Sequence, residues 1–353
     1  MVRLKDIALR AGVSLMTVSK ALRNARDISP GTKARIKVLA DQMGYVPDSA
    51  AQNLRNRNSK LFGLIISSVT NPIFVRMAAA IEERTRELGC DLILAHSLNM
   101  ADREESSIRR LLSRRVDGLF ISPFYRMTET APIFEELRRR NTPTVIIGHR
   151  APFCQNFANV ESDDLGGSFA ATSHLLELGH KRIAFFCGPL GTPWAQERLD
   201  GYRRALRTAQ IEIDDNLIFA AGATIDEGEK AALQMINESV KVTAVQAVND
   251  LVAIGAASLF LNQGIRIPQD LSVVGFGNII ASEYFRVPLT TLRHPKYRLG
   301  EAAVDCMLQL LDGKKPEPRR LPAGLVIRES TAPHLPMRIA KTSHHTLESK
   351  LKT

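Results

Sequence analysis

The sequence predicts an α/β protein with two parts, a small all-α head at the N-terminus and a larger body of parallel sheets and helices. The chain has 353 residues, which is too long for one ordinary hydrophobic core. Residues 1–60 hold 12 Lys and Arg against 4 Asp and Glu, whereas residues 61–333 hold 31 against 32. Short apolar runs in the body alternate with helical stretches, which is typical of parallel sheets with crossover helices.

The uneven charge indicates what kind of partner the head has. Almost all of the net charge of +10 lies in the first sixth of the chain, so a basic head is attached to a neutral body. Such a head indicates a polyanionic partner. A solvated basic tail remains the alternative at this point, because composition alone does not define a surface.

Composition also narrows the class of protein. A hydrophobic share of 44% and a charged share of 24% are those of a soluble globular protein. The four cysteines have no paired spacing, so we expect buried reduced thiols rather than a zinc site or a disulfide framework. They are Cys90, Cys154, Cys187 and Cys306. No apolar run resembles a signal peptide or a membrane span, and we expect a cytoplasmic protein.

Two short amphipathic helices are predicted at the start of the chain. The apolar positions are Leu4, Ile7, Ala8, Ala11, Val13, Val18, Ala21 and Leu22. Gly12 can adopt the positive φ that ends the first helix, and the Ser14 side chain can cap the second by accepting from the amide of Met16 or Thr17. Helices joined by so few residues cross steeply, with Ala8 at the crossing and valines between them. This is helix-turn-helix geometry.

The exposed side of the second helix suits DNA. Its outward side chains carry no negative charge: they are Leu15, Met16, Thr17, Ser19 and Lys20, preceded by Ser14. Hydroxyl groups can bind phosphates, Lys20 can approach guanine or a phosphate, and the two apolar side chains can contact thymine methyl groups. A helical hairpin that packs on another protein segment is the competing interpretation of this motif alone.

A third helix is predicted to close the head, followed by a marginal one. Ser29-Pro30 is a cap followed by proline at the first helical position, and Gly44 ends the helix. The segment "DSAAQNLRNRN" (48–58) is too short to be a stable helix alone in water. We expect it to form only against a partner.

The head resembles that of the lactose and purine repressor family (LacI/GalR). The resemblance is carried by "LKDIALRAGVSLMTVSKAL" (4–22), by Gly44-Tyr45, by Pro47 and by "AAQNL" (50–54). It implies that Tyr45, Ala51 and Leu54 also contact DNA, with Leu54 inserted between base pairs of the minor groove. Asp48 and Gln52 replace the Asn and Arg that are frequent in the family, so these two are not counted as contacts.

Seven buried strands are predicted in the body, in two sets. They are "LFGLIIS" (61–67), "DLILAHS" (91–97), "DGLFISP" (117–123), "PTVIIGH" (143–149), "RIAFFCGP" (182–189), "AVQAVND" (244–250) and "LSVVGFG" (271–277). Ligands of parallel sheets bind at the carboxyl ends of the strands. The segments there contain no nucleotide-binding loop, nucleophile elbow or metal motif, so we predict no cofactor, no metal site and no enzymatic activity.

The body resembles the same family in order and over almost its full length. Matching segments include "RVDGLFIS" (115–122), "GHKRIAFFCGP" (179–189), "ERLDGYRRAL" (197–206) and "LTTLRHP" (289–295). The resemblance implies two lobes like those of periplasmic sugar-binding proteins, with crossings near Ser162, Leu292 and Pro322.

The predicted domains follow from these boundaries. A helix-turn-helix head spans 1–46, a hinge helix and linker 47–60, and an effector-binding and dimerisation core 61–333. Within the core, lobe 1 covers about 61–161 and 293–321, and lobe 2 about 162–292 and 322–333. Residues 334–353 are expected to form a disordered tail without a coiled coil, and so without a tetramer.

The resemblance also implies an effector site between the lobes. Its predicted residues are Phe74, Ser122, His149, Trp194, Arg198, Asn249, Gly277 and Asn278. Arg198 offers a planar fork of donors for hydroxyl or carboxylate groups, while Phe74 and Trp194 offer aromatic faces. Core packing is the alternative for both aromatic residues, and a surface charge for Arg198.

Two departures from the family bear on the effector. Gly148 and Gly277 stand where many members carry an Asp that accepts from sugar hydroxyls, and His149 and Arg150 are added. We therefore hypothesise an effector that is anionic or less hydroxylated than a simple sugar. A cleft without any effector is the alternative.

Together these features predict a homodimeric, sequence-specific regulator of transcription, and a repressor in particular. It is expected to bind a palindromic operator in double-stranded nucleoid DNA under the control of a sugar, sugar acid, sugar phosphate or similar molecule. Effector binding would change the angle between the lobes and fold or melt the hinge helices. A solute-binding protein for transport is the less favoured reading, since it would have no basic head.

Overall fold

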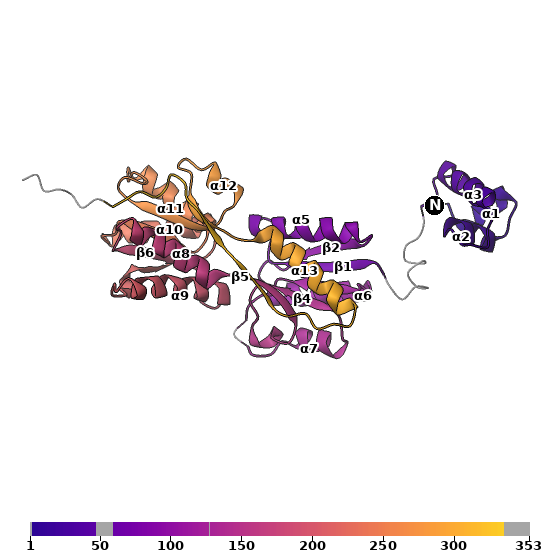
Figure 1. Ribbon diagram of the computed structural model, residues 1–353, viewed down its shortest axis with the longest axis horizontal. Helices are drawn as coiled ribbons and strands as arrows, with labels where there is room; N and C mark the ends of the chain where they lie inside the picture. Colours follow the sequence, from indigo (N-terminus) through magenta and orange to yellow (C-terminus); the bar gives the residue numbers. More distant parts are fainter. Residues whose placement is uncertain (1, 47–58, 127, 335–353) are drawn as a thin grey trace, which may run out of the picture. The chain divides into compact units, whose positions relative to one another are not determined.

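The computed structural model describes residues 2–46, 59–126 and 128–334. These residues fall into two compact units, which divide at Ser59 and Lys60. We describe the first unit as the head and the second as the core (Figure 1). The predicted hinge helix and tail lie outside the described residues.

The head consists of three helices around one small apolar cluster. They are α1 (Leu4–Ala11), α2 (Leu15–Leu22) and α3 (Pro30–Gln42). Its buried residues are Ile7, Ala8, Val18, Ala21, Ile36 and Ala40. Gly12 has a φ of 64° and ends α1, while Ser29 caps α3 by accepting from the Thr32 amide at 3.3 Å. The predicted helices and the predicted wedge of Val18 against Ala8 are therefore present.

The first lobe of the core is built on a sheet of six parallel strands. Their order is β11-β5-β4-β3-β1-β2. The strands are β1 (Leu61–Ile66), β2 (Asp91–His96), β3 (Gly118–Ile121), β4 (Thr144–Ile147), β5 (Ala158–Asp163) and β11 (Arg319–Pro322). The helices α5 (Pro72–Glu87) and α13 (Lys296–Leu311) bury one face, and α6 (Ala101–Ser113) and α7 (Pro132–Arg139) bury the other.

The second lobe repeats this design with a mixed sheet. The order is β12-β10-β9-β8-β6-β7, and only β12 is antiparallel to its neighbour. The strands are β6 (Ile183–Cys187), β7 (Ile218–Ala220), β8 (Ala244–Ala247), β9 (Ser272–Gly277), β10 (Thr290–Arg293) and β12 (Gly324–Val326). Figure 1 shows α8 (Asp164–Glu177) and α9 (Pro193–Thr208) on one face, opposite α10 (Ile225–Asn237) and α11 (Asp250–Asn262). A short helix, α12 (Ile280–Glu283), follows β9.

The chain crosses between the lobes three times. It leaves lobe 1 between β5 and α8, returns between β10 and α13, and leaves again between β11 and β12. Each crossing directly follows a strand, so the carboxyl ends of β5, β10 and β11 carry the connection.

Of the twelve strands in the described part of the chain, five were not among the seven predicted. β5 ("ANVESD") and β11 ("RRLP") have polar residues because they lie toward the edge of the first sheet, and β7 and β12 are only three residues long. The segment of β10 was predicted only as a crossing between the lobes near Leu292. The expectation of four buried thiols is also corrected, since Cys90 is partly exposed while the other three are buried and all four are free.

None of the described helices is long and apolar enough to cross a membrane.

Candidate DNA-binding and effector sites

The turn between α1 and α2 fixes the start of the candidate recognition helix. After Gly12, the Val13 amide donates to the Ala8 carbonyl at 3.1 Å, which closes the first helix. Ser14 then caps α2, since its Oγ accepts from the Thr17 amide at 3.1 Å and lies 2.9 Å from the Thr17 hydroxyl. Of the two predicted partners of this cap, the structure selects Thr17.

The outward face of α2 is apolar at its start. Leu15 is 53% exposed and Met16 is 57% exposed, whereas Val18 and Ala21 are buried in the head. Thr17 and Ser19 are half-buried. Because large apolar side chains gain nothing from exposure to water, two adjacent ones at the tip of a capped helix indicate a contact surface.

The ammonium group of Lys20 is less available for binding DNA than the sequence indicated. Its ammonium group forms an ion pair with Asp27, which lies after the end of α2. The hydrogen bond from Lys20, opposed slightly by burial, lowers the pKa of the Asp27 carboxyl. The absence of acidic residues on α2 itself did not reveal this partner, because it comes from the following loop. For Lys20 to reach DNA, this exposed ion pair must open.

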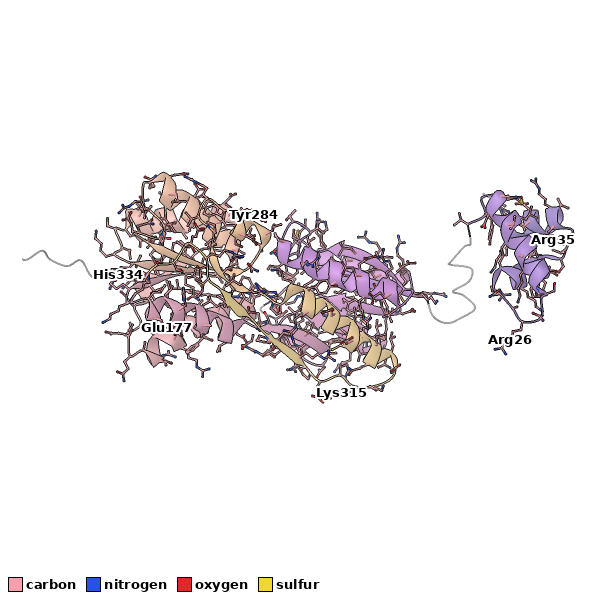
Figure 2. All side chains as sticks on the ribbon, turned by 45° about the horizontal axis from the view of Figure 1, so that its top comes forward. Arg26, Arg35, Glu177, Tyr284, Lys315 and His334 are labelled. Atoms are coloured by element: carbon pink, nitrogen blue, oxygen red, sulfur yellow. The ribbon has the colours of Figure 1, made fainter. Side chains whose placement is uncertain are left out.

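Of the other predicted DNA contacts, Tyr45 lies among the described residues and two do not. Tyr45 packs partly buried against the apolar cluster of the head. Ala51 and Leu54 lie outside the described residues. Arg26 and Arg35 are exposed (Figure 2) and add positive charge to the surface of the head, where Arg35 Nη2 also donates to the Ala11 carbonyl at 3.2 Å.

In the core, Arg198 is buried, and each of its three guanidinium nitrogens donates to an acceptor of the protein. Its Nε and Nη2 donate to Asp164 Oδ1 at 2.9 and 2.7 Å, and its Nη1 donates to the Val248 carbonyl at 2.6 Å. The guanidinium lies 3.7 Å from the ring centre of Phe276 and 5.0 Å from that of Trp194. The surface-charge alternative is thus wrong, but the donors that were expected to face a ligand are occupied by the protein itself.

His149 connects the two lobes. It follows β4 of lobe 1, and its Nε2 lies 3.0 Å from Glu197 Oε2 on α9 and 3.6 Å from Asp164 Oδ2 on α8, both in lobe 2. Burial favours the neutral imidazole, but the contact with Glu197 and the charges of Asp164 and Glu161 outweigh burial and raise the pKa of His149. Protonation therefore strengthens a bond between the lobes.

Arg320 makes a second connection at the same place. From β11 of lobe 1 it donates to Glu197 Oε2 at 2.6 Å, and to Asp163 Oδ1 at 2.9 Å. Burial raises the pKa of Glu197, but the close contact with the His149 ring and the hydrogen bonds from Arg320 overcome this and lower that pKa to about 2. We call His149, Glu197 and Arg320 the interlobe latch. Sequence reasoning missed Asp164, Glu197 and Arg320, because their partners are far away in the chain.

Three more of the predicted effector residues have structural roles within the protein. Asn249 caps α11 by accepting from the Val252 amide at 2.8 Å, and its amide group donates to Ala223. Asn278 Oδ1 accepts from Arg328 at 2.7 Å. Gly277 has a φ of 147°, a conformation that favours glycine.

The carboxylate of Asp250 lies beside Gly277. A Cβ placed on Gly277 would lie 3.1 Å from Asp250 Oδ2, and Asp250 is buried. The carboxyl accepts from Ser282 at 2.7 Å and from the Ile279 amide at 2.9 Å. Burial raises the pKa of Asp250. Asp250 is turned away from solvent and does not replace a carboxylate at position 277, so the hypothesis of a more positive cleft stays a prediction.

Phe74 and Ser122 lie on lobe 1. Phe74 packs, partly buried, on the apolar cluster between the sheet and α5, which agrees with core packing as much as with a ligand contact. Ser122 is 8% exposed and follows β3. The predicted effector residues thus come from both lobes, and His149 with Arg198 share one network through Asp164.

Comparisons with known proteins agree with both units. Residues 3–48 match the bacterial regulatory proteins of the lacI family, and residues 172–331 match a periplasmic binding protein-like domain. The transcriptional repressor PurR of Vibrio atlanticus is 33% identical over 324 residues, which cover 90% of this chain and 95% of that protein. The repressor CytR of Escherichia coli is 31% identical, covering 93% and 96%.

Solved structures extend the similarity to the whole fold. The Lac repressor dimer bound to operator and the anti-inducer ONPF has a TM-score of 0.84 at 29% identity, covering 94% of this chain and 99% of that one. The complex of the regulator CelR with cellobiose has a TM-score of 0.70 at 28% identity, covering 94% and 100%. Because the match runs through both the head and the core, the chain belongs to the LacI family of bacterial regulatory proteins.

Proposed function

We propose that this protein is a transcriptional repressor that binds operator DNA as a homodimer and responds to a small molecule held between the core lobes. It would act on nucleoid DNA in the bacterial cytoplasm. In the proposed division, residues 1–46 bind the major groove, 47–60 form the hinge, and 61–333 bind the effector and the second subunit. The observation that carries the proposal is the capped helix α2 with its exposed apolar tip, in a head of a family of DNA-binding regulators.

The DNA contacts follow from this helix. Leu15 and Met16 would contact thymine methyl groups, and Ser14, Thr17, Ser19 and Lys20 would bind phosphates or base edges. Lys20 gives up its exposed pair with Asp27 at little cost, because exposed ion pairs contribute little to stability. Tyr45, Ala51 and Leu54 complete the proposed contact set.

Homodimer formation is supported by exposed apolar side chains on both lobes. Ile280 is 76% exposed and Tyr284 is 78% exposed at α12 of lobe 2, where Figure 2 shows Tyr284 at the surface. Leu94 on the edge strand β2 of lobe 1 is 45% exposed. Apolar groups of this size are typical of a subunit interface. A two-fold pairing would hold two heads at operator spacing.

Control by an effector would use the interlobe latch. A molecule that changes the angle between the lobes must keep or break the contacts of Glu197 with His149 and Arg320, which join the lobes. Such coupling is typically about 1 to 3 kcal/mol, which corresponds to about a 5- to 150-fold change in affinity for DNA.

The proposal is tested by DNA binding of the full-length protein. Genomic fragments captured by the purified protein would be sequenced to define the operator, and gel shifts would then compare variants on it. Met16→Glu places a negative charge on the proposed contact face and should weaken operator binding by at least about tenfold. Leu9→Glu is the matched control, because Leu9 is an 88% exposed apolar residue on α1. Equal effects of both changes, or none, would contradict the assignment of α2.

Effector control needs a separate measurement. Trp194 is the only tryptophan of the chain and stacks near Arg198, so its fluorescence reports on the proposed cleft. A panel of sugars, sugar acids and sugar phosphates would be titrated, and each binder would be tested for its effect on the gel shift. Tight binding of a neutral pentose or hexose alone would remove the hypothesis of an anionic effector.

A core without an effector is the second candidate, and one observation favours it. The guanidinium of Arg198 already has protein acceptors for its Nε, Nη1 and Nη2 atoms. Operator binding that no member of the panel changes, with constant Trp194 fluorescence, would support this alternative.

A further inference from the structure

A groove of about 640 Å³ runs along the second and third crossings between the lobes. It is formed by α5, by the start of α13 and by the link between β11 and β12. Of the effector residues predicted from sequence, only Asn278 lines this groove. The groove therefore adjoins the predicted effector residues at Asn278, but Arg198 and His149 do not line it.

Four cationic side chains line the groove: Arg76, Arg293, Lys296 and Arg298. No Asp or Glu lines it. Within the described parts of the chain, none of these four cations has a carboxylate within 4.0 Å, whereas Arg198 and Arg320 nearby are both paired. A cluster of unpaired cations repels itself, and an anion bound in the groove would relieve that repulsion.

The positions of the charges are partly fixed by other contacts. The Lys296 ammonium donates to the carbonyls of Gly277 and Asn278 at 2.6 and 2.8 Å. The Arg76 guanidinium lies 4.8 Å from the ring centre of Tyr297. Two of the four charges are thus held before any ligand arrives, which reduces the entropy lost on binding.

The lowered pKa of Lys296 indicates that its ammonium group lacks a stabilising negative charge in the groove. Burial lowers its pKa, Asp250 opposes this, and the charges of Arg293 and Arg76 add to the lowering, with a net value of about 8. A bound anion would stabilise the ammonium and raise this pKa.

Two uncharged polar groups lie in the same groove. The 16-residue helix α13 begins there after Pro295 without a side-chain cap, so the positive end of the helix dipole lies at the groove, although the first amide, that of Lys296, donates to the His294 carbonyl at 2.8 Å. His294 also lines the groove, and its buried Nδ1 has no hydrogen-bond partner in the described structure. Burial lowers the pKa of His294 to about 3, so the ring is neutral and Nδ1 is a donor or an acceptor according to the tautomer.

We propose that this groove binds a small organic anion that carries a phosphate group, at a site separate from the cleft of the proposed effector. Its volume is that of a small-molecule site rather than of a macromolecular surface. Arg76, Arg298 and Lys296 hold the phosphate oxygens, and the rest of the molecule lies along the crossing segments. Because the groove borders two crossings, an anion there contacts residues of both lobes.

Isothermal titration of the full-length protein tests the proposal, with ribose 5-phosphate and ribose as a pair that differs only in the phosphate. At matched ionic strength, we expect ribose 5-phosphate to bind and inorganic phosphate to compete with it. The double variant Arg76→Gln/Arg298→Gln should weaken binding at least about tenfold. The control variant Arg86→Gln/Arg110→Gln removes the same charge from two exposed arginines without ion pairs and should bind as the wild type does.

Several results would overturn the proposal. These are equal binding of ribose and ribose 5-phosphate, an equal loss in the groove and control variants, and unchanged binding in the groove variant. Displacement of the phosphate by a short DNA duplex at equal charge concentration would assign the cations to nucleic acid instead. Unchanged melting temperatures of both variants show that the protein is folded. Since this test uses no operator, the groove can fail while the proposed repressor function stands.

Discussion

The interlobe latch predicts a stability that depends on pH, and Glu197→Gln is the change that isolates it. The substitution keeps the size and shape of the side chain but removes the charge that holds His149 at 3.0 Å and Arg320 at 2.6 Å. Glu197 also accepts from the Leu165 amide at 3.3 Å, a contact that the amide oxygen of Gln can preserve. The lost free energy therefore reflects mainly the two ionic contacts between the lobes.

The size of the effect follows from the pKa of Glu197. A fall from 4.5 to about 2 corresponds to about 3 kcal/mol, at roughly 1.4 kcal/mol for each pH unit. The side chain of Glu197 is 23% exposed and that of Arg320 is 40% exposed, so solvent screens part of this. We expect a loss of about 1 to 2 kcal/mol, or a fall of about 2 to 6 °C in the melting temperature.

The two titrating groups act in different pH ranges. The pKa of Glu197 is lowered, so its contribution is full above its ordinary value of 4.5 and is lost as the pH falls toward about 2. The pKa of His149 is raised, so its contribution is full below 6.5 and is lost as the pH rises through the raised value. The difference between wild type and Glu197→Gln should therefore be larger at pH 6 than at pH 9. Titration of Lys296 occurs in both proteins and cancels.

Urea denaturation of both proteins at pH 6 and pH 9 measures this difference. Asp270→Asn is the control, because Asp270 also has a pKa lowered to about 2, by hydrogen bonds from Arg266, but lies at the surface. Its removal should change stability little and equally at both pH values. A difference for Glu197→Gln that is the same at pH 6 and pH 9 would refute the role of His149, and no loss at either pH would refute the latch.

Four further predictions follow from the head, the core and the tail. Ser14→Ala should destabilise the head by about 1 kcal/mol, because it removes the cap of α2; unchanged operator affinity in a gel shift would argue against this cap. Leu54→Ala should weaken operator binding by a few kcal/mol while effector binding stays intact, and an unchanged gel shift would show that the hinge assignment is wrong. Arg198→Ala should cost about 3 to 5 kcal/mol in urea denaturation, because it leaves Asp164 buried without its partner; a loss below 1 kcal/mol would contradict that pairing. Light scattering at micromolar concentration should give the mass of two chains, and a mass near four would contradict the predicted lack of a tetramer.

Local patterns predicted the head and the buried strands well, because their signals are carried by neighbouring residues. The cap at Ser14, the positive φ at Gly12 and the apolar spacing of α1 and α2 all act within a few positions of the chain. The central strands are continuous apolar runs because helices cover both of their faces. The edge strands have no such pattern, and β11, with two arginines in four residues, is invisible to it.

The candidate site was harder to predict, since its chemistry depends on contacts between distant segments. Arg198 was identified by its motif, but its ion-pair partner Asp164 lies 34 residues away in the chain. The sequence at Gly277 gave no sign that the buried carboxylate of Asp250, 27 residues earlier in the chain, lies beside it. Similarly, the four cations of the groove come from α5, from β10 and from the start of α13. No spacing rule in one segment could bring them together.

The distribution of ion pairs separates two kinds of positive charge in the core. At the latch and in the adjoining network of Asp164, Arg320 and Arg198 are neutralised by carboxylates of the protein, so any ligand that uses them must first displace Glu197 or Asp164. In the groove, Arg76 and Arg298 have no such competitor within the described structure. A ligand at the latch therefore gains only the difference between its own contacts and those it replaces, while an anion in the groove gains its contacts in full. Because both places join the same two lobes, we propose that an anion in the groove and a protonated His149 would both act on the angle between the lobes. By linkage, each must then change the affinity for the other by the same factor.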